Sequence, residues 1–84
     1  MGKKPRHKPA RLPEKLLQIR TRLGLSQSEM FRKLNIEDYA EVKRISDYET
    51  GKSEPPLIVL LQYARVAGIS TDVLISDKLN LPKK

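Results

Sequence analysis

Apolar residues near the start of the chain recur at the spacing of an α-helix. They stand at i, i+4, i+7 and i+11 of one stretch, at Leu12, Leu16, Ile19 and Leu23. This spacing places the four side chains on one helix face. Pro13 suits the first turn, where its missing N–H is not needed, and Gly24 suits the position after the last turn. The pattern predicts a helix over about residues 13–23.

Two capping patterns follow and mark the starts of two more helices. Ser26 and Glu29 match the S-x-x-E capping box, in which a hydroxyl and a carboxylate each accept a backbone N–H. Asp38 and Glu41 repeat that spacing as D-x-x-E, and apolar residues after each pair again fall on one face. These patterns predict helices over about 27–34 and 39–50.

Proline and glycine residues bound the last part of the helical pattern. Pro55 and Pro56 forbid continuation of the third helix and can start a fourth, which Gly68 ends. The run Leu57–Leu61 could alone form a buried strand, but the sequence offers no second strand to pair with it. We predict helices over about 56–67 and 71–76, then a C-terminal tail over 77–84. Five short helices joined by tight turns form a compact all-α fold.

The composition excludes several classes of protein. With 84 residues the chain has room for one small domain. It has no Cys and one His, so we expect no disulfide, no thiolate nucleophile and no metal site. His7 has no placed partner and no carboxylate pair has an obvious cleft, so we expect neither an enzyme nor a cofactor. No apolar run approaches the roughly 20 residues that span a bilayer, and no secretory segment follows the N-terminus, so we expect a cytoplasmic protein.

The net charge of +7 lies at the two ends of the chain. Residues 1–11 carry five basic side chains and no acidic one, residues 83–84 are both Lys, and charges balance over 12–82. Because residues 1–11 are also nearly free of apolar side chains, we expect a flexible basic arm before a domain over 12–76. Such an arm either aids solubility or binds DNA phosphates. Its basic residues are Lys3, Lys4, Arg6, Lys8 and Arg11.

Three motifs occur in a recognisable order. LGLSQSEM occupies residues 23–30, ISDYETGK occupies 45–52, and a proline pair then precedes the apolar residues Leu57, Leu60 and Leu61. This order resembles the lambda-repressor-like (XRE/Cro-type) helix-turn-helix family, which reads approximately L-S-Q-x-E-L-A, then I-S-x-x-E-x-G, then proline and an amphipathic helix. The resemblance covers about 13–76 and implies a five-helix lambda-repressor-like domain.

The resemblance also implies which residues contact DNA. The helix over 39–50 would enter the major groove, while the start of the helix over 27–34 would meet phosphate. The residues that match DNA-contacting positions are Gln27, Ser28, Val42, Lys43, Arg44, Asp47, Lys52 and Ser53. For these positions the alternative is an ordinary solvated side chain. Arg20 and Glu49 match family positions that pair to tie the first helix to the third, a structural role.

The chain departs from the family pattern between the second and third helices. The spacing from Leu34 to Glu49 is about four residues longer than usual, so either the turn is a longer loop or the third helix begins a turn earlier. Three acidic residues in this segment would repel phosphate at the groove mouth: Glu37, Asp38 and Glu41. Phe31 replaces a small residue, which predicts a changed packing angle between the two helices.

The resemblance and the basic arm together favour a sequence-specific transcriptional regulator that binds double-stranded DNA, acting in the cytoplasm on the nucleoid of a prokaryote or on phage DNA. Homodimerisation, in solution or only on DNA, stays open. The alternative is a protein-interaction module, an antitoxin-like subunit or a bridging cofactor, that uses the helix-turn-helix frame and binds DNA only weakly and without specificity. The neutral domain and the acidic segment favour this alternative.

Overall fold

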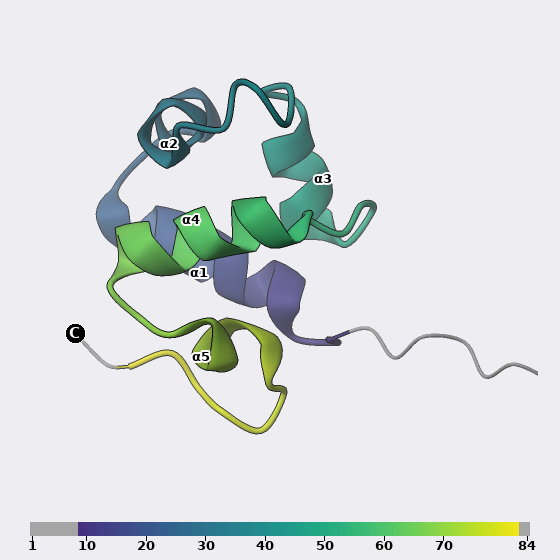
Figure 1. Ribbon diagram of the computed structural model, residues 1–84. Coiled ribbons are helices and arrows are strands. Elements are labelled where there is room, and N and C mark those ends of the chain that lie inside the picture. The colour runs from purple at the N-terminus through teal and green to yellow at the C-terminus, as the bar shows by residue number, and fades with distance from the viewer. Residues whose placement is uncertain (1–8, 83–84) are drawn as a thin grey trace, which may run out of the picture.

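The computed structural model describes residues 9–82, and over that range it confirms an all-α fold. Five helices follow one another: α1 (Leu12–Leu23), α2 (Gln27–Leu34), α3 (Arg44–Thr50), α4 (Leu57–Ala67) and α5 (Thr71–Ile75) (Figure 1). Four of the predicted helices agree with these bounds within a residue. The predictions on residues 1–8 and 83–84, including those on Lys3, Lys4, Arg6 and Lys8, lie outside the described residues.

The capping signals between α1 and α2 act as the sequence predicts. Gly24 adopts the left-handed conformation, with φ of 71°, and its N–H donates to the carbonyl of Thr21. The Ser26 hydroxyl accepts from Glu29 N at 3.1 Å, and Glu29 Oε1 accepts from Ser26 N at 2.7 Å. These hydrogen bonds stabilise the carboxylate and lower the pKa of Glu29. The chain therefore turns sharply from α1 into α2.

The prediction of a helix over 39–50 is wrong at its start, because α3 begins only at Arg44. After Asn35, which is left-handed, Ile36 is fully buried and its carbonyl accepts from Tyr39 N and Ala40 N at 2.8 and 3.0 Å. In a second turn, Arg44 N donates a hydrogen bond to Glu41 O at 2.9 Å. Of the two alternatives for the extra residues, the structure has the longer loop.

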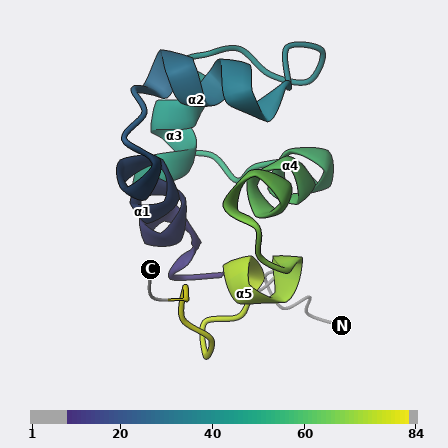
Figure 2. The same cartoon turned by 90° about the vertical axis from the view of Figure 1, so that its left-hand side faces the viewer.

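The helices bury their apolar faces against one another. α1 packs against α3 and α5, while α4 packs against α2 and α5, so that α1 and α4 face each other across the core (Figure 2). Leu16, Met30, Leu34, Ile45 and Tyr63 are fully buried at this centre. Burial of a large apolar side chain stabilises the fold by roughly 1.5–3 kcal/mol, so these contacts hold the helices at their crossing angles.

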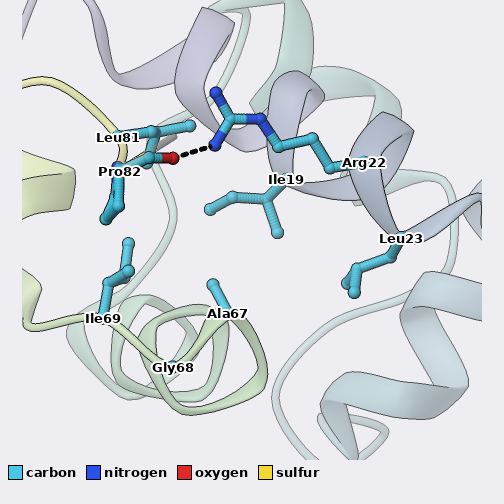
Figure 3. Close-up of a pocket in the computed structure, with 8 residues that line it drawn as sticks. All are labelled: Ile19, Arg22, Leu23, Ala67, Gly68, Ile69, Leu81 and Pro82. Carbon is cyan, nitrogen blue, oxygen red and sulfur yellow. Dashed lines mark hydrogen bonds between the residues drawn. The ribbon is translucent and has the colours of Figure 1, made fainter. Parts of the chain in front are cut away.

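The segment after α5 was predicted to be a tail, but residues 77–82 pack against α1. Leu81 is buried, and Arg22 Nη1 donates to the carbonyl of Pro82 at 2.6 Å. Figure 3 shows Leu81 and Pro82 across an apolar cavity of about 310 Å³ from α1 and from the end of α4. The remaining residues that line the cavity are Ile19, Arg22, Leu23, Ala67, Gly68 and Ile69. The segment is not a free tail because the buried Leu81 anchors it to the core, although its sequence has no helical periodicity.

One polar atom in the core predicts a stabilising substitution. The Tyr63 hydroxyl is buried without a hydrogen-bond partner among the described residues, and burial raises the pKa of Tyr63 above its ordinary range. A buried unsatisfied hydroxyl costs about 1–3 kcal/mol, which Tyr63→Phe removes while it keeps the ring. We expect the melting temperature, measured by circular dichroism, to rise by about 4–8 °C for each kcal/mol of this cost that is removed. A lower melting temperature would show that the hydroxyl has a partner in solution.

Candidate nucleic-acid interface

One side of α3 is buried and the other is open. Ile45, Tyr48 and Glu49 point into the protein, and they hold the helix against the core. The predicted contact residues Lys43 and Val42 lie on the turn that leads into α3, not on the helix as the sequence predicted. The side chain of Lys43 is 72% exposed and its amine lies 3.6 Å from Glu41 Oε1. At that exposure the ion pair is weak, so Lys43 is available to another anion.

Three of the predicted contact residues bind one another. Arg44 Nη1 donates to Asp47 Oδ2 at 3.1 Å and to Ser53 Oγ at 3.4 Å. The carbonyl of Asp47 accepts from Lys52 N and Ser53 N at 2.9 and 3.2 Å. These bonds order the turn after α3, in which Lys52 is exposed. Arg44 and Asp47, both predicted to contact DNA, therefore bind each other in the free protein.

The buried ion pair behind α3 joins three helices. Arg20 Nε donates to Glu49 Oε2 at 2.6 Å, and Arg20 Nη2 donates to Glu49 Oε1 at 3.0 Å. Arg20 Nη1 donates to the carbonyl of Leu25, and Gln27 Nε2 donates to Glu49 Oε1 at 3.3 Å. The hydrogen bonds to Glu49 raise the pKa of Arg20. Gln27, which was predicted to bind phosphate, is thus tied to Glu49, whereas Ser28 beside it is exposed.

A family model for helix-turn-helix domains matches residues 16–74. The chain belongs to this helix-turn-helix family, of the XRE and lambda-repressor type. No curated protein and no solved structure matches the chain. Membership makes the protein a DNA-binding protein of the regulator type.

The base of the expected arm belongs to the helix-turn-helix domain. Arg11, predicted to be part of a flexible arm, is the residue before α1, and its Nη1 donates to the carbonyls of Asp77 and Leu79 at 3.0 and 3.4 Å. Its Nε lies 3.8 Å from Glu14 Oε2. Arg11 therefore holds the C-terminal segment, and this use competes with a phosphate contact.

Two important residues of the helix-turn-helix domain were missed by the sequence analysis. Lys15 is fully buried, and its amine donates to three backbone carbonyls, that of Val73 in α5 and those of Ser76 and Leu79 after it. Asp77 accepts from two backbone N–H groups before α1. The sequence could have indicated the burial of Lys15, because this residue lies between Leu12 and Leu16 on the apolar side of the helix. No sequence pattern indicates the role of Asp77.

The described residues show neither a metal site nor a membrane helix. No group of three or more His, Cys, Asp or Glu side chains within residues 9–82 could hold a metal ion. Among the helices of this same part of the chain, none is long and apolar enough to cross a membrane.

Proposed function

We propose that this protein is a sequence-specific, double-stranded-DNA-binding transcriptional regulator. The turn before α3 and the first residues of α3 face the major groove, and the basic arm adds phosphate contacts. The observation that carries the proposal is that α3 has one buried side and one exposed side. Ile45 and Glu49 hold its buried side against the core. Lys43 and Lys52 are exposed at its two ends. A helix held in this way presents its free side as a rigid surface for base edges.

The roles of the contact residues follow from their chemistry. Val42 is exposed before α3 and can meet a thymine methyl group, and Lys43 can donate to guanine. Arg44 and Asp47 can read guanine and cytosine only if their mutual hydrogen bond is exchanged for bonds to bases. We assign phosphate contacts on either side of the groove to Lys52, Ser53 and the exposed Ser28.

The charge distribution assigns separate roles to the domain and the arm. Basic and acidic residues balance over 12–82, and Glu37, Asp38 and Glu41 lie in the turn before α3. The domain therefore has little non-specific attraction for DNA, whereas Lys3, Lys4, Arg6 and Lys8 supply it from the arm. A homodimer on a two-fold site, formed in solution or on DNA, and a place on the nucleoid or on phage DNA belong to the same proposal.

A second candidate function is a module that binds a protein partner. It is favoured by the exposed Tyr39, 57% accessible in an acidic turn, and by the mutual pairing of Arg44 and Asp47. An aromatic ring among carboxylates suits a basic protein surface better than it suits phosphates. In this case DNA binding would come from the arm alone and would carry no sequence preference.

Charge reversal before α3 tests the proposal and separates the two functions. We expect Lys43→Glu with Arg44→Glu to reduce affinity for a selected duplex by about 30-fold or more, because the double variant loses two base contacts worth about 1–3 kcal/mol each. Fluorescence anisotropy on selected and random duplexes measures the preference. Arg65→Glu with Lys78→Glu is the matched control, since both residues are exposed and lie outside α2 and α3.

The two outcomes are distinct. The proposal requires the variant at 43 and 44 to lose the preference for the selected duplex while the control keeps it, with both variants folded by circular dichroism. Equal losses in the two variants would mean that only net charge matters. That result would reject base readout and favour the protein-binding module.

A further inference from the structure

The start of α1 is capped by a side chain from the other end of the chain. Arg11, the residue at the N-cap position, makes no side-chain cap hydrogen bond. Instead Asp77 Oδ2 accepts from Ala10 N and Asp77 Oδ1 accepts from Arg11 N, both at 3.0 Å. A carboxylate at this position also interacts favourably with the positive end of the helix dipole. Both oxygens of Asp77 thus fix the two residues that precede α1.

The segment that carries Asp77 is itself held in place. The amine of Lys15 donates to Val73 O and Ser76 O at 2.7 Å and to Leu79 O at 2.8 Å. Its three N–H groups are thereby satisfied inside the protein, although burial lowers the pKa of Lys15. Because these carbonyls lie on both sides of Asp77 in sequence, Lys15 sets the position from which Asp77 reaches α1.

The residues fixed by Asp77 lie next to the turn that follows α3. Pro9 lines the same small cavity as Ser53, Glu54 and Pro55. A Cβ atom added at Gly51 would lie 3.4 Å from Pro13 Cγ, which shows how closely the start of α1 approaches this turn. Residues 9–11 are therefore held beside one of the two places proposed to contact phosphate.

We propose that Asp77 is a positioning residue for DNA binding. By holding Ala10 and Arg11, it fixes the base of the basic arm beside the turn of Lys52 and Ser53. This inference rests on the proposed function, in which the arm contacts phosphate. An arm that starts close to the DNA has a higher effective concentration of its cations at the DNA phosphates. It therefore loses less conformational freedom when it binds. Without the cap, the arm would start from a freer point and bind less well.

A measurement without DNA tests the placement. The chain has no cysteine, so Ala10→Cys gives a single attachment point for a nitroxide label on an exposed residue. We expect the label to broaden the backbone amide NMR signals of residues 51–54, and Asp77→Ala to weaken that broadening. Asp72→Ala, which removes the same charge from an exposed position in α5, should leave it intact. Broadening that is equal in all three proteins would overturn the proposal.

A double-mutant cycle tests the effect on binding. One background keeps the arm, and the other replaces Lys3, Lys4, Arg6 and Lys8 with Gln. With the arm intact, Asp77→Ala should weaken binding of the selected duplex about fivefold and reduce the salt slope by about one, the share of one phosphate contact. In the background with the neutral arm, Asp77→Ala should change the affinity and the salt slope no more than Asp72→Ala does. Asp77→Asn, which keeps one acceptor oxygen, should show a smaller loss and serves where the Ala variant is unstable.

The backgrounds separate the two ways in which the idea can fail. If neutralising the arm leaves the salt slope unchanged, the arm's part in the proposed function is wrong and the inference falls with it. If the arm matters but Asp77→Ala weakens binding equally in both backgrounds, the residue acts only through fold stability. That second result would overturn the inference alone.

Discussion

Replacing Glu49 with Ala is expected to destabilise the fold by about 3–5 kcal/mol, because it leaves the largely buried Arg20 guanidinium without its partner. The pair is bidentate, and the Glu49 side chain is only 4% exposed. The same substitution removes an acceptor from Gln27. Natural domains are stable by about 0.05–0.15 kcal/mol per residue, roughly 4–13 kcal/mol for a chain of 84 residues, so the variant should lose a large share of its stability.

Urea unfolding followed by circular dichroism measures this effect. Arg20→Ala should be similarly destabilising, and the double variant should lose less than the sum of both, because neither charge is then stranded. Arg44→Ala is the control, since it breaks the exposed pair with Asp47 and should change the free energy of unfolding by less than about 1 kcal/mol. If Glu49→Ala were no more harmful than this control, the ion pair would not be what holds α3 to α1.

Removal of residues 1–8 is expected to weaken DNA binding strongly and to make it less sensitive to salt. The segment carries Lys3, Lys4, Arg6 and Lys8 and no acidic residue. Each phosphate contact contributes about 0.9 to the slope of log affinity against log salt, so the slope should fall by up to about 3.6. Between 50 and 200 mM salt, the full chain should then lose about 100-fold more affinity than the truncated chain.

Anisotropy titrations at four or more salt concentrations measure the slopes. Substitution of the same four residues by Gln, at unchanged length, is the matched control and should reproduce the truncation if charge is the cause. The ratio of affinities for selected and random duplexes should stay constant, because base contacts are proposed for the region around α3 and not for the arm. An unchanged slope would contradict the phosphate role of the arm.

The helix boundaries that could be predicted depend on local chemistry. A capping box at Ser26, a left-handed Gly24 and the proline pair before α4 act within a few residues, and the structure has each of them as the pattern indicates. The start of α3 was predicted wrongly because Asp38 and Glu41 have the spacing of a cap. Burial of Ile36 favours a turn there, and that burial depends on the whole core.

The candidate site was harder to predict because its contacts join residues that are far apart in sequence. The positions of Arg20 and Glu49 came from the family pattern, and no local signal shows that Arg44 reaches Ser53 or that Gln27 reaches Glu49. Asp77 lies 66 residues from Arg11 in sequence, a separation at which spacing has no predictive value. What decides these contacts is the crossing of α1, α3 and the C-terminal segment.

The hydrogen bonds of Lys15 also bear on when the protein can fold during its synthesis. A ribosome makes Lys15 early, but the three carbonyls that accept its hydrogen bonds are 58 to 64 residues further on. A nascent chain that ends before Leu79 would have to bury an ammonium group whose partners are incomplete, which is costly. The domain should therefore stay open until its last residues have left the exit tunnel, and then close in one step.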